Sequence, residues 1–303
     1  MDRKIIICPL VVLLLALLVL SPVLIVQAQP STGPNLLSPG DNTYTNDNTP
    51  YFEWENIGTE NITHYRLVID NDINFADGDN SYDNQILTDN WDNFKTHTEN
   101  ALPEGTWYWK VQAENENGWG PFSETRTLTI DVTSPTVVSI SVSESDNIIT
   151  DSEIGETFTV TVQFDENMDN TVTPDVEFIP NVVGETLTFD NRWWSSDNRY
   201  YYENYTISDA NVENFDVDIK VENAKDLAGN LQVSFTGNDK FDIDTKNPTV
   251  VSIIVSDNVI ADNDAGETFT VTIQFDENMD NTVTPDVEFI PNVVGETLTF
   301  NVG

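Results

Sequence analysis

The sequence predicts an all-β protein built of tandem antiparallel β-sandwiches, the last of them truncated. Short alternating apolar runs are separated by Asn, Asp, Gly and Pro turns, and no segment sustains a helical period. In addition, residues 155–189 return as residues 266–300, 111 positions later, with the single change of Val162 to Ile273. A repeat of this length is too long for a helical solenoid unit and matches one sandwich domain.

The flanks of the repeat agree with this reading. Residues 134–143 return as residues 247–256, 113 positions later, so two residues are missing before Asp257. The sequence stops at Gly303, about halfway through the second copy. Because half a sandwich cannot close its core, we expect the sequence to be a fragment of a longer array.

Residues 1–28 are expected to be a signal peptide. Arg3 and Lys4 precede an apolar run over residues 5–26, and Val26-Gln27-Ala28 offers a cleavage site after Ala28. A retained N-terminal anchor is the alternative, since the run is long enough to span a bilayer. Prolines at positions 9 and 22 shorten its helix and favour cleavage. The only cysteine, Cys8, precedes the apolar core, which excludes a lipoprotein.

The chain is strongly acidic, with 52 Asp and Glu against 12 Lys and Arg and a net charge of −40. Removing Asp2, Arg3 and Lys4 takes away a net +1, which leaves −41 on the exported part. Such a surface repels nucleic acid and anionic membranes, so neither is an expected partner, apart from the leader or an unseen anchor. Two explanations stay open: solubility in saline surroundings, or carboxylates that collect divalent cations.

Residues 31–132 are expected to form the first sandwich. Strand-like runs cover residues 51–54, 65–69, 106–113 and 125–130. In the third run, Trp107, Trp109, Val111 and Ala113 alternate and should share the core face.

This segment resembles fibronectin type III domains of exported microbial proteins. The likeness rests on LLSPGDN (36–42), TPYFEW (49–54), YRLVIDNDINF (65–75), LPEGTWYWKVQA (102–113) and NGWGPFS (117–123). The resemblance implies a tyrosine corner, in which the Tyr108 hydroxyl would tie the loop before its strand to the backbone.

Residues 133–246 resemble a different module, the bacterial Ig-like repeats of large surface proteins. SPTVVSISVS (134–143), FDENMDNT (164–171) and AKDLAGN (224–230) carry that likeness, and FDIDTKNPTV (241–250) leads into the truncated copy, residues 247–303. Strands are expected near residues 136–143, 156–164, 174–179, 185–194, 199–208, 215–221 and 231–243, the last broken at Gly237.

The sequence offers little for catalysis, and we expect no enzyme activity. Only His64 and His97 are present, both in the first domain, whereas a serine triad or zinc site in the repeat would need histidine there. The motif Asp70-x-Asp72-x-Asn74 resembles the start of an EF-hand, but Phe75 stands where glycine is needed and Ser81 where glutamate is needed. A turn explains this motif better.

Calcium is the expected cofactor, bound where domains join. In a seven-strand sandwich, loops 165–174 and 223–230 share the end at which the chain enters through residues 130–135. Calcium takes six to eight oxygen ligands, chiefly carboxylates and carbonyls. The predicted ligands at the first junction are Asp131, Asp165, Glu166, Asp169 and Asp226, and those at the second are Asp242, Asp244, Asp276, Glu277 and Asp280. The alternative is that these residues only make turns and cap backbone groups.

An aromatic block lies in the second domain: Trp193, Trp194, Tyr200, Tyr201, Tyr202 and Tyr205. Alternation places Tyr201, Tyr205 and Ile207 on one face and Tyr200 and Tyr202 on the other. Trp194, Tyr200 and Tyr202 are therefore candidate ligand-binding residues for sugars or proteins, unless the rings only cover the edge of the sandwich. Asn61 and Asn204 begin N-glycosylation sequons.

The leading expectation is a secreted or cell-surface, non-enzymatic modular protein, such as an adhesin, stalk or envelope component. Its repeats would act as spacer and interaction modules whose partners are other proteins or surface glycans. Two alternatives are accessory modules of a polysaccharide- or protein-degrading enzyme, whose catalytic domain would lie beyond Gly303, and a carbohydrate-binding module.

Overall fold

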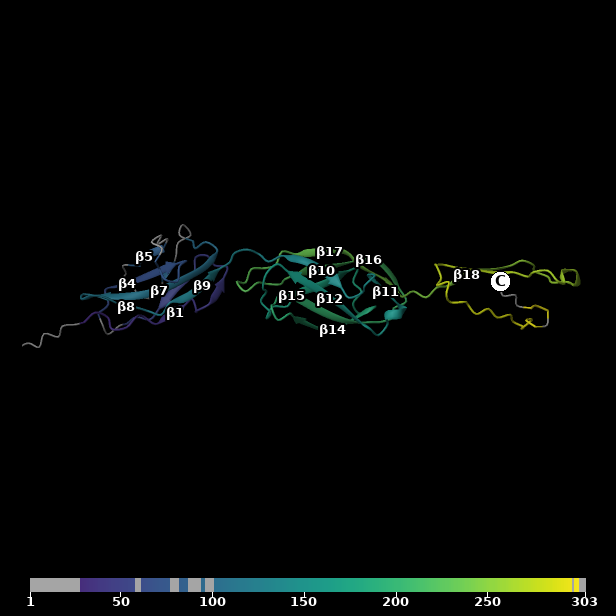
Figure 1. Ribbon diagram of the computed structural model, residues 1–303, viewed down its shortest axis with the longest axis horizontal. Coiled ribbons are helices and arrows are strands. Elements are labelled where there is room, and N and C mark those ends of the chain that lie inside the picture. The colour runs from purple at the N-terminus through teal and green to yellow at the C-terminus, as the bar shows by residue number, and fades with distance from the viewer. Residues whose placement is uncertain are drawn as a thin grey trace, which may run out of the picture. The chain divides into compact units, whose positions relative to one another are not determined.

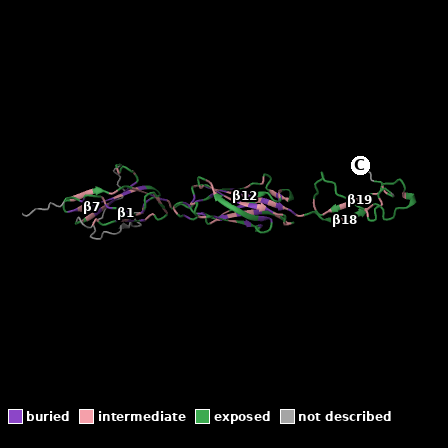
Figure 2. Ribbon diagram, turned by 90° about the horizontal axis from the view of Figure 1, so that it is seen from below, coloured by how far each residue is buried: buried purple, intermediate pink, exposed green. Residues whose placement is uncertain are grey.

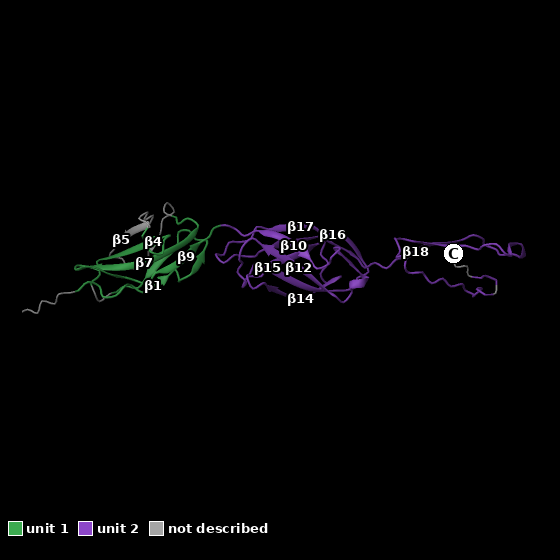
Figure 3. Cartoon of the chain, viewed as in Figure 1, with its two compact units in different colours: residues 1–132 green, residues 133–303 purple. Residues whose placement is uncertain are grey.

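The computed structural model describes residues 28–57, 61–76, 82–86, 94–95, 101–295 and 297–299, with backbone alone for residues 82–86 and 94–95 (Figure 1). The predicted leader up to Gln27, together with Ser81 and His97, lies outside these residues. The chain divides into two compact units, residues 1–132 and 133–303 (Figure 3). The expected boundary after Lys246 stays a prediction.

The first unit is a sandwich whose strands pair antiparallel, except that β2 pairs with β9 in parallel. One sheet has the order β1-β3-β6, the other has the order β2-β9-β7-β4-β5, and β8 pairs with β7. The strands are β1 (Leu36–Ser38), β2 (Thr43–Thr45), β3 (Tyr51–Trp54), β4 (His64–Asp70), β5 (Tyr82–Ile86), β6 (Phe94–Lys95), β7 (Gly105–Asn115), β8 (Gly118–Phe122) and β9 (Arg126–Ile130).

Strand β7 confirms the expected alternation, because Trp107, Trp109, Val111 and Ala113 are all buried. Phe52 of β3 contacts Trp109 edge to face at 5.0 Å, so the two sheets meet through aromatic rings.

The expected tyrosine corner is made by a different residue. The indole Nε1 of Trp107 donates to the Pro103 carbonyl oxygen at 2.8 Å, which is the tie that the resemblance assigns to Tyr108. Because side chains alternate along β7, Trp107 faces the core beside this loop while Tyr108 faces outward.

The motif at residues 70–74 forms a turn, as expected. Asp70 Oδ1 accepts from Asp72 N at 2.8 Å, and Asp72 Oδ1 accepts from Asn74 N at 3.0 Å. These are local side-chain-to-backbone bonds of the kind that aspartate makes after a strand.

Residues 133–246 of the second unit form another sandwich. Its sheets have the orders β10-β12-β15-β14 and β11-β17-β16-β13. The strands are β10 (Val137–Val142), β11 (Ile148–Thr150), β12 (Thr157–Phe164), β13 (Asp175–Ile179), β14 (Leu187–Trp194), β15 (Tyr200–Ile207), β16 (Glu213–Glu222) and β17 (Phe235–Asp244), with a 3-10 turn at Asp151–Glu153.

The core of this sandwich is closed from both sheets. Phe158, Val160, Val162 and Phe164 of β12 are at most 1% exposed. Burial of each such side chain stabilises the fold by about 1.5–3 kcal/mol.

Two features of this sandwich differ from expectation. Strand β11 pairs in parallel with β17 and was not predicted, since three residues are too few to show a pattern. Strand β17 runs through Gly237 without ending, but its register against β16 shifts between the pairs Val217–Phe241 and Ile219–Gly237. The expected break is therefore a bulge.

The second copy reproduces the first part of this sandwich. Strand β18 (Val250–Val255) pairs with β19 (Val271–Phe275), and a 3-10 turn covers Asp262–Asp264. Four of the apolar residues of β18 stay exposed, whereas those of β19 are half-buried (Figure 2). Ile253 of β18 is 64% exposed, against 6% for Ile140 in the first copy.

Within the described part of the chain, no helix is long and apolar enough to cross a membrane.

Candidate functional site

Loops 165–174 and 223–230 lie together, as the strand count predicted. Asp169 N donates to Lys225 O at 2.8 Å, and Met168 and Asp226 form an isolated β-bridge. Val233 N donates to Pro135 O at 3.1 Å, which ties the start of this unit to the same end of the sandwich.

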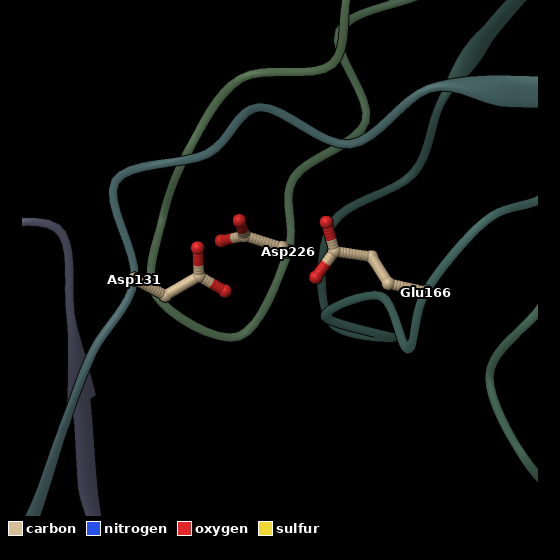
Figure 4. Close-up of side chains that lie close together, drawn as sticks. All are labelled: Asp131, Glu166 and Asp226. Atoms are coloured by element: carbon tan, nitrogen blue, oxygen red, sulfur yellow. The ribbon is translucent and has the colours of Figure 1, made fainter. Parts of the chain in front are cut away.

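Three of the five residues predicted at the first junction come together. Carboxylate oxygens of Asp131, Glu166 and Asp226 all lie within 4.8 Å of one another, and Figure 4 shows their side chains turned toward a common space. Asp131 belongs to the connecting segment, two residues before Thr133. Asp226 is only 1% exposed, and its two oxygens accept from Asn230 N and Nδ2 at 2.8 and 2.7 Å. These oxygens still have lone pairs for a cation.

The other two predicted residues cap backbone groups. Asp165 accepts from Thr136 N and Oγ1 at 2.8 and 2.7 Å, and Asp169 accepts from Thr171 N and Oγ1 at 2.9 and 2.7 Å. Burial acts to raise the pKa of Asp165, but the hydrogen bonds from Thr136 outweigh it and hold this pKa below its ordinary value.

A second acidic cluster contains Glu213, Asp244 and Glu277, whose carboxylate oxygens also lie within 4.8 Å of one another. Asp244 and Glu277 belong to the predicted set, whereas Glu213 was missed because its pairing with Asp244 across β16 and β17 is not visible in the sequence. Lys246 Nζ contacts Glu213 at 2.9 Å. Burial and the nearby charge of Asp244 raise the pKa of Glu277.

The remaining residues of the second set accept hydrogen bonds from nearby groups. Asp276 accepts from Thr249, Asp280 accepts from Thr282, and Asp242 accepts from Asp216 N at 2.8 Å.

The two clusters share a pattern set by the repeat. Asp131 and Asp244 are 113 positions apart, and Glu166 and Glu277 are 111 positions apart, which are the offsets of the two repeated segments. The pairing of a connecting-segment aspartate with a loop glutamate therefore occurs twice.

The aromatic block is divided between two faces, which confirms the alternation. Tyr201, Tyr205 and Ile207 are buried, whereas Tyr200 and Tyr202 are half-buried on the outer face. There Tyr202 stacks on Trp193 with centroids 5.0 Å apart, and Tyr200 stacks on Tyr202 at 6.5 Å.

Trp194 lies on the inner face, apart from the other two candidate ligand-binding residues. It packs on Phe164 and Tyr201, with ring centroids 5.5 and 5.0 Å apart. Trp194 also lines a cavity of about 710 Å³ at the hairpin of β14 and β15.

A buried carboxylate lies next to this cavity. Glu203 is 4% exposed and accepts from the hydroxyls of Tyr201 and Tyr205, and Arg192 Nη1 lies 3.8 Å from its Oε1. Burial raises the pKa of both tyrosines, and the Glu203 charge adds to this effect. Sequence reasoning missed Glu203 and Arg192, although an arginine within an aromatic block of an acidic chain is a usable signal.

The two sequon asparagines differ in setting. Asn61 is exposed before β4. Asn204 is half-buried within β15, and its Oδ1 accepts from Thr159 Oγ1 at 2.9 Å.

Comparison with known proteins gives no family. No protein-family model matches the chain, and no curated protein matches it. Among solved structures, the chain is similar to the FN1–FN3 domains of chicken CNTN1, at 16% identity and a TM-score of 0.31 over 73% of this chain and 69% of that one. It is also similar to the D00-D0 domain of intimin, at 13% identity and a TM-score of 0.29 over 69% and 98%. The assignment as tandem β-sandwiches rests on the strand pairing described above.

Proposed function

We propose that this chain is an exported, non-enzymatic modular surface protein, such as an adhesin, stalk or envelope component. Its β-sandwiches would serve as spacer and interaction modules of the bacterial Ig-like and fibronectin type III kinds. The partners would be other proteins or surface glycans.

The near-identical repeat is the observation that carries this proposal. Residues 155–189 and 266–300 differ at one position, and β18 pairs with β19 in the register that β10 makes with β12. In both pairs the register shifts after the first valine, at Val137 and at Val250. A duplication that preserves both sequence and strand register is typical of a repeated module, where the number of copies sets the length of the protein.

The chemistry of the described residues also favours a non-enzyme. His64 Nδ1 lies 3.1 Å from Glu114 Oε2, within hydrogen-bond distance, and the His64 side chain is 37% exposed. A general base needs a nucleophile or substrate site within hydrogen-bond reach, and this histidine lies on a strand beside a carboxylate.

We further propose that Glu166 and Asp226, with Asp131 of the connecting segment, bind calcium. Three carboxylates within 4.8 Å repel one another, and a divalent cation removes that repulsion while loop carbonyls and water complete its shell. The recurrence of the aspartate–glutamate pair at Asp244 and Glu277 supports a purpose beyond turn formation.

Expression of the whole chain in a bacterial host tests the proposed function. Mass spectrometry should find a mature N-terminus at Gln29, and the purified protein should leave a panel of polysaccharides and peptides unchanged. A chain that keeps its leader inside the cell, or one that hydrolyses any member of the panel, would contradict the proposal.

A further inference from the structure

We propose that the cavity at the β14–β15 hairpin binds a saccharide residue of a glycan. This rests on the proposed function as an interaction module, and it assigns the ligand class and the site. The cavity has a volume of about 710 Å³, which lies within the range of about 300–1,000 Å³ usual for small-molecule sites. It is lined by Asn170, Thr173, Arg192, Trp193, Trp194, Ser195, Ser196, Asn198 and Tyr201.

Two elements far apart in sequence hold the polar side of the cavity. Asn170 Nδ2 of loop 165–174 donates to Asn198 Oδ1 of the hairpin turn at 3.2 Å, and Met168 N donates to Asn198 O at 3.0 Å. The turn is closed by Asn198 N donating to Ser195 O at 3.0 Å. The two carboxamides are therefore placed by the fold at the rim.

The aromatic side of the cavity is held by the core. Trp194 packs on Phe164 and Tyr201, and both of these residues are buried. Phe164 is 0% exposed, so the indole lies against a fixed ring. A rigid indole at the margin of a cavity offers a ligand an apolar surface with little entropy cost.

Arg192 supplies donors without giving the cavity a strong positive charge. Its guanidinium carries five N–H groups in a planar fork, and its side chain is 50% exposed. The Glu203 carboxylate at 3.8 Å compensates the charge. A small anion is therefore a poor match, and the net charge of −40 on the chain disfavours a polyanion.

A saccharide matches this combination of groups. Its hydroxyls both donate and accept, as do the carboxamides of Asn170 and Asn198 and the hydroxyls of Thr173 and Ser196. The C–H face of a pyranose ring is apolar and can lie on the Trp194 indole. Mixed donors and acceptors around an aromatic wall thus favour a neutral sugar over a peptide side chain.

The outer face of the same hairpin is a weaker candidate. Trp193 and Tyr202 are nearly parallel, at an interplanar angle of 12°, and Tyr200 stacks on Tyr202 at 22°. Rings that stack on one another have part of their faces covered. Trp193 lines the cavity together with Trp194, whereas Tyr200 and Tyr202 are not among its lining residues, so the outer face contributes one ring to the proposed site.

An oligosaccharide array probed with the purified chain tests this proposal. The array carries oligomers of neutral hexoses, N-acetylhexosamines and uronic acids, beside a peptide library. We expect binding to at least one neutral oligosaccharide, followed by calorimetric titration of the best one. Arg192→Gln and Asn198→Gly should each weaken that binding by about tenfold or more, since each removes polar contacts. Glycine keeps the positive φ of 55° at position 198.

Tyr202→Ala decides between the two faces and should change affinity less than about threefold. Circular dichroism and melting temperature should match between each variant and the parent chain. If Arg192→Gln fails to fold, the loss of affinity in Asn198→Gly is the result that tests the proposal. The proposal is overturned if no neutral oligosaccharide binds, if peptides bind instead, if affinity is insensitive to the folded cavity variants, or if Tyr202→Ala alone abolishes binding.

Discussion

Asp165 accepts two hydrogen bonds from Thr136, one from N at 2.8 Å and one from Oγ1 at 2.7 Å. Asp276 repeats the arrangement with Thr249, at 2.7 and 2.8 Å. Each pair joins the start of a module to the loop after its first long strand. Two carboxylates from the predicted ligand sets therefore join each loop to the start of its module, and they fix the loops from which Glu166 and Glu277 project.

Replacing Asp165 should destabilise the sandwich formed by residues 133–246. Asp165→Asn leaves one oxygen acceptor for the two donors of Thr136. We expect the free energy of unfolding to fall by about 1 kcal/mol. The loss is small because Asp165 is exposed and solvent screens its interactions. Urea unfolding of the chain measures this loss. A transition unchanged by the substitution would contradict the assigned role.

The same contact has a predicted pH dependence. The hydrogen bonds of Thr136 hold the folded pKa of Asp165 below its ordinary value of 3.8. The contribution of Asp165 is therefore fully present above about pH 3.8 and is lost as pH falls through the folded pKa. The stability difference between the parent chain and Asp165→Asn should accordingly shrink in acid, and a constant difference from pH 6 to about pH 2 would count against this account.

Calcium should stabilise the chain if the first acidic cluster binds it. With the affinity usual for extracellular modules, millimolar calcium adds roughly 0.4–1.4 kcal/mol and raises the melting temperature of the second unit by a few degrees. Calorimetric melting with calcium and with a chelator measures the shift.

A matched pair of variants tests where the calcium binds. Asp131→Asn combined with Glu166→Gln should remove the calcium-dependent shift. Asp165→Asn combined with Asp169→Asn should keep it, because these two residues hydrogen-bond to threonines instead of lying in the cluster. Equal shifts in both double variants, or no shift in the parent chain, would exclude the site.

The Glu203 network should make the sandwich of residues 133–246 sensitive to alkali. Burial and the Glu203 charge raise the pKa of Tyr201 and Tyr205 above the ordinary value of 10.0. Their contribution to stability is complete below pH 10 and decreases as pH rises above it, because the unfolded phenols ionise first. Ultraviolet titration of tyrosinate, followed together with unfolding, measures this behaviour.

Tyr205→Phe should remove one hydrogen bond to the buried Glu203 and cost about 1–3 kcal/mol at neutral pH. Tyr202→Phe on the outer face is the control and should have little effect. If all nine tyrosines ionised near pH 10 while the chain stayed folded, the network would not have the proposed strength.

Residues 247–303 alone should not fold cooperatively. Val250 and Ile253 are 51% and 64% exposed there, whereas the matching Val137 and Ile140 are 7% and 6% exposed in the complete sandwich. Circular dichroism of this piece should show no cooperative melting transition. A sharp transition would mean that the module boundary differs from the one proposed.

The strands that alternate clearly could be predicted from sequence, and those that depend on long-range pairing could not. Strands β7 and β12 carry a strict apolar alternation, so their existence and inner faces follow from local pattern. Strand β11 has three residues and depends on its parallel pairing with β17. No local sequence pattern indicates such a pairing.

For the candidate sites too, some features could be predicted from the sequence and others could not. Strand counting brought loops 165–174 and 223–230 together, because chain direction alone decides which ends meet. It could not tell that Asp165 turns to Thr136 while Glu166 turns to Asp226, since neighbouring carboxylates in a loop differ only in orientation. Likewise, a buried Glu203 contradicts the usual preference of charged residues for the surface, and its burial is tolerable because two phenols donate to it and Arg192 lies nearby.

Small-angle X-ray scattering of a lengthened chain tests most directly whether the repeat is a spacer. Inserting one further copy of residues 134–246 after Lys246 should increase the maximum dimension by at least about 33 Å, the length of a ten-residue strand. The original sandwich of residues 133–246 should melt at an unchanged temperature. An insertion that leaves the maximum dimension unchanged, or that abolishes cooperative folding, would contradict the view that these modules stack to set length.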